Sequence, residues 1–302
     1  MAIVTRSQIQ NLMWPGLALI NLDNKYWPLL SNRMYQTIET NKAFDVTVEM
    51  VPVGYARKMD ETEPFSVQSN SILNKTEATH ISYGAALEFS FEAIDDNLYV
   101  DQYVDGATQI KQSLLVTQDL YGAAPFNNGF SSTSPIGDGQ PFFSNIHPLG
   151  QGAGTYSNLL SPASLSETSL TQMVTGIQTF PDPSGKVLNY QAKQLVVHPN
   201  LQFDAARILH DAERPGTANR DIGVFYNMDL ISGGIIVNPY LQNTIASYLQ
   251  STCPDSAVWF KRNMNETSTW MDEKNRIVGM GAFMRFSFVI TNARNAYGNQ
   301  GI

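Results

Sequence analysis

The stretch IGDGQPFFSNIHPLGQGAGTYSN, residues 136–158, places glycines, an aspartate, a histidine, two adjacent phenylalanines and a proline in one short run. Asp138 and His147 would form an acid–base pair if the loop between them folds back. The sequence places no nucleophile with a partner beside them, and catalysis depends first on geometry. The stretch is therefore either the catalytic loop of an enzyme or an assembly element.

The second interpretation rests on the turn-forming and apolar residues of the same stretch. Asp138-Gly139 favours a tight turn, and Phe142 and Phe143 would anchor the loop through apolar contacts. His147-Pro148 would fix the exit of the loop, because the residue before a proline is restricted to extended conformations. On this interpretation the loop has a structural role.

Other catalytic and metal-binding motifs are missing from the sequence. The four histidines are not spaced as HxxxH or HExxH, and the only cysteine, Cys253, cannot form an internal disulfide. The glycines at 150, 152 and 154 do not complete a dinucleotide fingerprint, because Thr155 stands where its third glycine would be. The Gly-Lys-Ser/Thr of a P-loop is also absent from this segment. We expect no metal, no cofactor and no enzymatic activity.

The composition favours a subunit that is covered by neighbours. Only 15% of the 302 residues are charged, against roughly 25% in typical soluble domains. Interface cores are depleted in Lys, Glu and Asp, so a low charge with an ordinary apolar content indicates oligomerisation. The formal net charge of −8 argues against binding to phosphate backbones, because such binding depends on Lys and Arg.

The N-terminal region predicts neither a signal peptide nor a membrane span. Its apolar patch is interrupted by Trp14-Pro15-Gly16, and no stretch of the chain reaches about 18 apolar residues.

Two alternating segments predict a β-strand arm. In AFDVTVEMVP, residues 43–52, apolar and polar residues alternate with the period of a half-buried strand. HISYGAALEFSFEA, residues 80–93, shows the same alternation. We expect these two strands to form an extended two-stranded arm with a long tip, whose exposed edges favour pairing with another chain.

A long helix is predicted from about Asp96 to Leu120, ended by Gly122 and Pro125. Apolar residues at spacings of four, three, four and seven form one stripe along it. The stripe consists of Tyr103, Ala107, Ile110, Leu114 and Tyr121.

The remaining sequence predicts a mixture of helices and strands, so the fold class is α+β. Ser164 or Ser166 is the candidate N-cap of a helix in SLSETSLTQMVTGIQTF. KQLVVHP reads as a buried strand, and a helix is expected to start at Asn200. Residues 221–241, 256–263 and 277–292 are rich in β-branched and aromatic residues and read as strands.

Motifs along nearly the whole chain resemble the major capsid proteins of tailed bacteriophages, especially the Mu-like major head subunit family. They are GDGQPFFSNIHP followed by GTYSNLLSPASLSETSLTQM, then KQLVVHPNLQFDAARIL and the terminal RFSFVITNARNAYGNQG. NKAFDVTVEMVP and ISYGAALEFSFEAIDDNLY precede them in the same order as in the family. The order and spacing of the motifs carry the resemblance.

The resemblance implies the tailed-phage capsid shell fold, with an N-terminal arm, an extended loop (E-loop), a peripheral domain with a long spine helix, and an axial domain. The implied boundaries are 1–42 for the N-terminal arm, 43–95 for the E-loop, 96–190 for the peripheral domain with its spine helix at 96–120, 191–275 for the axial domain, and 276–302 for the return to the peripheral domain. The residues implied in assembly are Asp138, Phe142, Phe143 and His147 in the assembly loop and Phe44, Lys58, Lys75 and Phe89 in the E-loop. We expect Lys58 and Lys75 to be solvated rather than cross-linked.

The resemblance further implies a major capsid protein that assembles into the icosahedral shell around phage double-stranded DNA. The implied partners are further copies in hexamers and pentamers, a separate scaffolding protein and a portal, with DNA enclosed but not specifically bound and no membrane. The implied location is the virion, after assembly in the cytoplasm of a bacterial host. The alternatives are an encapsulin-like nanocompartment shell protein and a soluble hydrolase that uses Asp138 and His147.

Overall fold

The computed structural model describes residues 29–61, 64–65, 67, 71–91, 100–150, 154–212 and 222–302. These contain both helices and strands, which confirms the α+β class. The chain divides into two compact units. The first unit comprises Met1–Asp45, Thr79–Gly122 and Trp259–Phe288, and the second comprises Val46–Ala78, Ala123–Val258 and Val289–Ile302. Most of the expected N-terminal arm, residues 1–28, lies outside the described residues.

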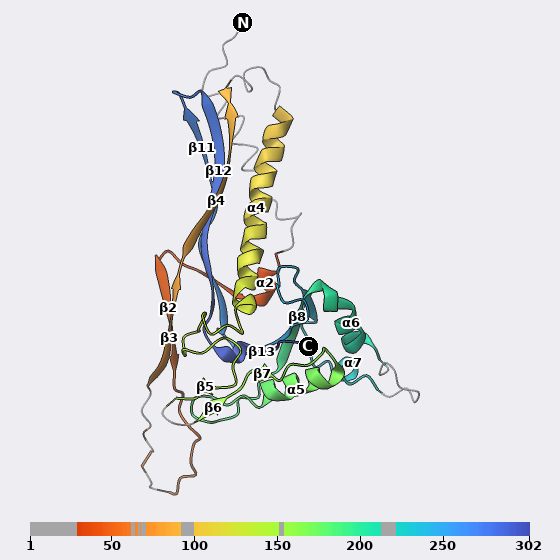
Figure 1. Ribbon diagram of the computed structural model, residues 1–302. Coiled ribbons are helices and arrows are strands. Elements are labelled where there is room, and N and C mark those ends of the chain that lie inside the picture. Colours follow the sequence, from red (N-terminus) through yellow and green to blue (C-terminus); the bar gives the residue numbers. More distant parts are fainter. Residues whose placement is uncertain are drawn as a thin grey trace. The chain divides into compact units, whose positions relative to one another are not determined.

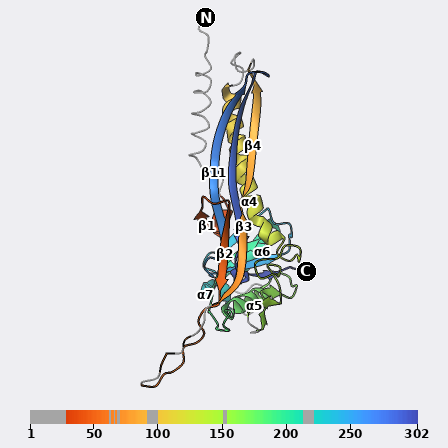
Figure 2. The same cartoon turned by 90° about the vertical axis from the view of Figure 1, so that its left-hand side faces the viewer.

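The first unit is built on a sheet of four strands in the order β1-β11-β12-β4. β12 and β4 pair antiparallel along ten residues, from Ile277 opposite Ser90 to Phe286 opposite Ile81. Figures 1 and 2 show the long helix α4 beside these strands. Rings of Tyr83, Tyr121 and Phe286 pack between the helix and the sheet. The elements are α2 (Ser31–Met34), β1 (Gln36–Glu39), β4 (Ile81–Ser90), α4 (Val100–Asn127), β11 (Ala257–Asp272) and β12 (Ile277–Ile290).

Helix α4 extends further than the sequence predicts. It passes through Gly122 and Pro125 and ends at Asn127. Proline lacks the N–H that would complete the helical ladder, which normally ends or kinks a helix. Here Ala123 and Phe126, on either side of Pro125, are fully buried, and this burial offsets the lost hydrogen bond. Residues 96–99 of the predicted helix lie outside the described residues.

The expected arm forms with a different partner strand. β2 (Phe44–Met50) pairs with β3 (Ile72–Thr79), a segment that we expected to belong to the tip. The predicted partner, 80–93, contributes β4, which pairs with β12 instead. The pairing prediction was therefore wrong, because alternation identifies a strand but does not choose its neighbour.

The second unit contains a five-stranded sheet in the order β7-β13-β10-β8-β9. β10 is antiparallel to both of its neighbours, whereas β9 runs parallel to β8 and β7 parallel to β13. Leu170 and Ile177 of α5 pack with Leu195 and Leu249 of the sheet in one buried cluster. The elements are β5 (His147–Pro148), β6 (Thr155–Tyr156), β7 (Leu159–Leu160), α5 (Glu167–Gln178), β8 (Ala192–Val197), α6 (Gln202–His210), α7 (Val224–Met228), β9 (Ile235–Val237), β10 (Ser247–Ser251) and β13 (Ala296–Asn299), with 3₁₀ turns at Pro199–Leu201 and Ala293–Asn295.

Several sequence predictions for this unit are confirmed and others need correction. The buried strand in KQLVVHP is β8. The helix expected from Asn200 starts with the 3₁₀ turn and becomes α-helical at Gln202. Of residues 221–241, expected to be strands, the described part from 222 onward contains α7 and only the short β9. Of the last segment, β12 lies in the four-stranded sheet but β13 joins the five-stranded one.

None of the described helices combines the length and the hydropathy that a membrane crossing requires.

The N-cap of α5 yields the first prediction. Ser166 Oγ accepts the backbone N–H of Ser169, and Ser169 Oγ accepts the backbone N–H of Ser166. Ser166→Ala removes this capping box and should cost about 1 kcal/mol of unfolding free energy, measured by urea unfolding of the unassembled subunit. The exposed Ser161→Ala is the control, and an equal loss in both variants would contradict the assigned cap.

Candidate functional site

The assembly loop begins with the turn that the sequence predicts. The backbone N–H of Gly139 donates to the carbonyl of Ile136, and that of Ile136 donates to the carbonyl of Gln140. Gly139 has a φ of +80°, a conformation that glycine adopts without steric cost. Asp138 Oδ1 accepts the backbone N–H of Gln140 at 2.9 Å. The turn directs the other carboxylate oxygen of Asp138 toward His147.

Phe142 and Phe143 anchor the loop to its own subunit. Both side chains are buried, and their ring centroids lie 4.2 Å apart. Phe143 stacks on Tyr248 of β10 and packs at a tilt against Phe130, while Phe142 meets the edge of Phe126 at the end of α4. Aromatic clusters of this kind add to the free energy of apolar burial. The apolar anchoring expected from the sequence is therefore present within the subunit.

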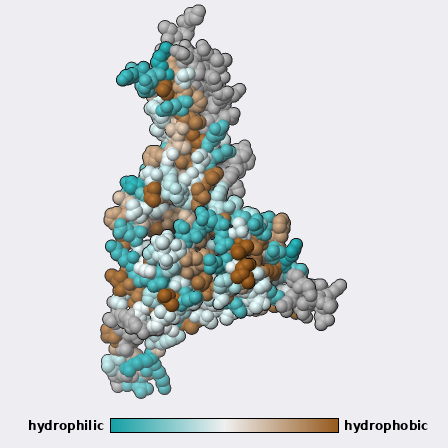
Figure 3. Space-filling view, in the orientation of Figure 1, coloured by the Kyte–Doolittle hydropathy of each residue, from teal (hydrophilic) through white to brown (hydrophobic). Residues whose placement is uncertain are grey.

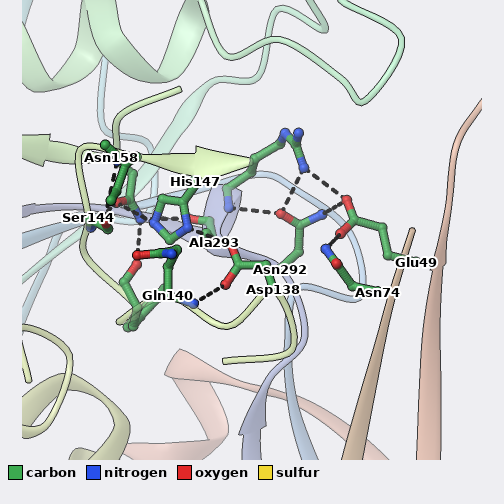
Figure 4. Close-up of polar contacts among 12 residues, drawn as sticks. Glu49, Asn74, Asp138, Gln140, Ser144, His147, Asn158, Asn292 and Ala293 are labelled. Carbon is green, nitrogen blue, oxygen red and sulfur yellow. Dashed lines mark hydrogen bonds and ion pairs between the residues drawn. The ribbon is translucent and has the colours of Figure 1, made fainter. Parts of the chain in front are cut away.

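His147 is fully buried, and both of its ring nitrogens have partners (Figure 4). Nδ1 lies 2.6 Å from Asp138 Oδ2, and Nε2 lies 3.0 Å from Asn158 Oδ1. The expected proximity of Asp138 and His147 is therefore present. Tyr156 packs against the imidazole at a tilt, with a centroid distance of 5.2 Å.

Asn158 determines what His147 can do. Its Nδ2 donates to the carbonyls of Phe142 and Ala293 at 2.7 and 2.9 Å, and its Oδ1 accepts the backbone N–H of Ser144. These partners fix the orientation of the amide, so Nε2 of His147 must donate to Oδ1. Nδ1 is then paired with the carboxylate of Asp138. Neither nitrogen is free to accept a proton from a substrate or a water molecule, which argues against the hydrolase alternative.

A second polar cluster lies next to this network and joins the β2–β3 hairpin to the rest of the second unit. We call Glu49, Asn74, Asn292 and Arg294 the Glu49 cluster. Glu49 Oε1 accepts from Asn292 Nδ2 and from Arg294 Nη1, each at 2.9 Å, and Oε2 accepts from Asn74 Nδ2 at 3.0 Å. Figure 4 shows the two carboxylate oxygens of Glu49 directed toward Asn74 and Asn292. One carboxylate of β2 is thus bonded to β3 and to the segment before β13.

Arg294 is held by several parts of the second unit at once. Its Nε donates to the carbonyl of Pro181 at 2.7 Å, and its guanidinium carbon lies 4.5 Å from the ring centroid of Tyr156. Burial raises the pKa of Tyr156, so the ring stays neutral beneath the cation. Nη2 is buried without a hydrogen-bond partner among the described residues.

The space beside these two clusters is small. A hollow of about 10 Å³ is lined by Glu49, Asn74, Asp138, Tyr156, Asn292 and Arg294, among others. It has room for about one water molecule, and a substrate would not fit. The described residues include no group of three or more His, Cys, Asp or Glu side chains that would suit a metal ion.

A second buried histidine lies in the first unit. His80 Nε2 is 3.2 Å from Asp45 Oδ2, and Nδ1 is 2.9 Å from Ser287 Oγ. Burial acts to raise the pKa of Asp45, but hydrogen bonds from Thr40 and Lys42, and a further one from His80, hold that pKa below its usual value. Asp45 therefore remains ionised, and His80 links it to Ser287 of β12.

None of the four E-loop residues named from the sequence is a member of either cluster. Lys58 and Lys75 are exposed, Phe44 is half-exposed and Phe89 is partly buried. The sequence analysis did not identify Glu49, Asn158 or Arg294. The only available signal was the position of Glu49 on the polar side of an alternating strand, which normally indicates a solvated residue.

Comparison with known proteins places these features in a family. A family model described as phage capsid protein matches residues 74–299, about three quarters of the chain. A search of curated proteins finds no match.

Solved structures share the fold at low sequence identity. A virus-like particle from Pyrococcus furiosus is 8% identical with a TM-score of 0.54, covering 97% of this chain and 99% of that one. The capsid of Myoviridae phage XM1 is 10% identical with a TM-score of 0.53, covering 93% and 94%. Gordonia phage Cozz gives 13% identity and a TM-score of 0.53, covering 93% and 90%. The chain has the phage capsid shell fold.

Asn158→Leu tests the role assigned to the buried amide. Leucine keeps a similar volume but leaves the Ser144 N–H, three carbonyls and His147 without their partner, so we expect a loss of about 3 kcal/mol or more in unfolding free energy. Asn145→Leu, at an exposed position of the same loop, should change it by about 0.5 kcal/mol or less. Urea unfolding measures both, and similar small losses would disprove the assignment.

Proposed function

The chain belongs to the phage capsid protein family and is a capsid shell protein, and we propose that its copies assemble as hexamers and pentamers into an icosahedral shell around double-stranded DNA. The observation that carries this proposal is an apolar surface on the hairpin. Phe44, Val46, Val48 and Met50, here called the β2 apolar strip, are 38% to 52% exposed. In Figure 3, hydrophobic areas appear along the margin of the hairpin and near α6 and α7.

The β2 apolar strip faces away from the protein, contrary to the sequence expectation of a buried apolar face. Asp45, Thr47 and Glu49, on the opposite side of the strand, are the more buried residues. A row of four adjacent apolar side chains is costly to leave in water. A neighbouring copy is the natural cover, because a shell repeats one subunit and pairs its surfaces many times.

The composition supports a shell protein that does not bind the enclosed DNA strongly. With 19 basic and 27 acidic residues, the chain lacks the excess of Lys and Arg that non-specific DNA binding requires. We propose that DNA is enclosed without specific contacts, that a separate scaffolding protein and a portal assist assembly in the host cytoplasm, and that the chain belongs to the Mu-like subgroup. The domain boundaries 1–42, 43–95, 96–190, 191–275 and 276–302 remain part of this proposal.

Two other functions fit the observations less well. An encapsulin-like shell would share the fold, but the family model that matches the chain describes a phage capsid protein. A hydrolase would need a free nitrogen on His147, and both nitrogens are occupied. His147→Ala should therefore reduce the stability of the subunit or its assembly. A hydrolase would instead lose its catalytic turnover in this variant while assembly stayed intact.

Assembly of the purified protein is the direct test. Negative-stain electron microscopy and light scattering, with and without a co-expressed scaffolding candidate, should show shells, rings of subunits or tubes. A 33.5 kDa monomer under every one of these conditions would contradict the proposal.

Substitutions in the β2 apolar strip test which surface assembles. Val48→Asp places a charge in the strip and should leave the protein as unassembled subunits, because burying an unpaired charge is strongly unfavourable. Val48→Thr, which keeps the side-chain shape, should have a smaller effect. Since Val48 is exposed, the unfolding temperature of the subunit should stay nearly unchanged in both. Normal shells from Val48→Asp would exclude the strip as an interface.

A further inference from the structure

We propose that the ion pair between Glu49 and Arg294 positions the β2–β3 hairpin, and so decides which face of β2 is presented for assembly. This inference rests on the proposed assembly of copies. It assigns to these two residues a role that differs from stabilising the subunit. Both residues and all their contacts lie within the second unit.

The alternation of β2 gives the strand one apolar face and one polar face. A strand with period two can bury either its apolar or its polar residues, and the hydrophobic effect alone would bury the apolar set. In this protein the polar set faces inward. Glu49 is the inward residue with the most partners in the second unit, where it accepts three side-chain hydrogen bonds.

The side chain of Arg294 is held in one position. Its Nε bond to Pro181, its stacking on Tyr156 and its position in the 3₁₀ turn before β13 leave the guanidinium little freedom. Glu49 is 245 residues away in the sequence. A carboxylate that meets this guanidinium therefore sets the position of β2 on the unit.

The ion pair discriminates between registers of β2. A slip or rotation of β2 by one residue would replace Glu49 with Val48 or Met50 and would leave the guanidinium of Arg294, whose side chain is 3% exposed, without a counter-charge. An unpaired buried charge strongly disfavours such a state. Apolar contacts would discriminate less between registers, since they are not directional.

Positioning the hairpin is a different role from adding to the stability of the subunit. Buried ion pairs often stabilise a protein no more than apolar residues of similar size, because both charges lose their hydration. Here one guanidinium nitrogen also lacks a hydrogen-bond partner among the described residues. A pair that serves only stability has no need of these charges, whereas a pair that selects one arrangement does.

The test compares the native protein with the double variant Glu49→Met/Arg294→Met in a Cys253→Ser background. Spin labels at Lys75→Cys on β3 and Thr171→Cys on α5, both exposed positions of the second unit, report the hairpin position by electron–electron distance measurement. We expect a single narrow distance peak in the native protein and its loss in the double variant. The unfolding temperature of the double variant should stay close to the native value, and its assembly products should be irregular.

Further variants keep the test decisive. Glu49→Gln retains the side-chain volume but removes the charge, and it should also broaden the distance distribution, which covers the case of an insoluble double variant. The exchange Glu49→Arg/Arg294→Glu should recover part of the narrow peak. The control is the exposed pair Asp204–Arg207, whose exchange should change neither distances nor assembly products.

The outcomes separate this inference from the proposed function. A narrow native-like peak and regular shells in the double variant and in Glu49→Gln would overturn the positioning role. A native protein that never assembles would overturn the proposed function, while the distance measurement would still judge the ion pair.

Discussion

The buried guanidinium of Arg294 is the constraint on which the arrangement of the second unit depends. A charge inside a protein must find a counter-charge and hydrogen-bond acceptors, because leaving it unpaired is strongly destabilising. Its acceptors come from the hairpin, from the loop after α5 and from its own 3₁₀ turn. Segments from both ends of the sequence therefore meet at one side chain.

Strand β2 turns its polar face inward and its apolar face outward. Glu49 and Asp138 lie in or beside buried networks with Arg294, His147 and Asn158, whereas the β2 apolar strip is exposed. In a monomer this distribution would be unfavourable. In the shell that we propose, the apolar surface becomes interior on assembly, and directional hydrogen bonds define the shape of the subunit beforehand.

Local features of the sequence predicted much of the fold but little of the candidate site. The α5 cap at Ser166, the buried strand β8 and the Asp138–Gly139 turn follow from neighbouring residues. The sequence did not show that β4 pairs with β12, that α4 passes through Pro125, or that β2 turns its polar face inward. Each of these outcomes depends on residues distant in the chain, such as Arg294 for Glu49. Alternation defines two faces and does not say which one is inside.

The most direct test of this account is a cryo-electron microscopy reconstruction of the assembled particle. The account predicts that Phe44, Val46, Val48 and Met50 are buried against a neighbouring copy, while Glu49 still contacts Arg294 within its own subunit. A shell in which these four side chains remain in solvent, or in which Glu49 has left Arg294, would contradict it.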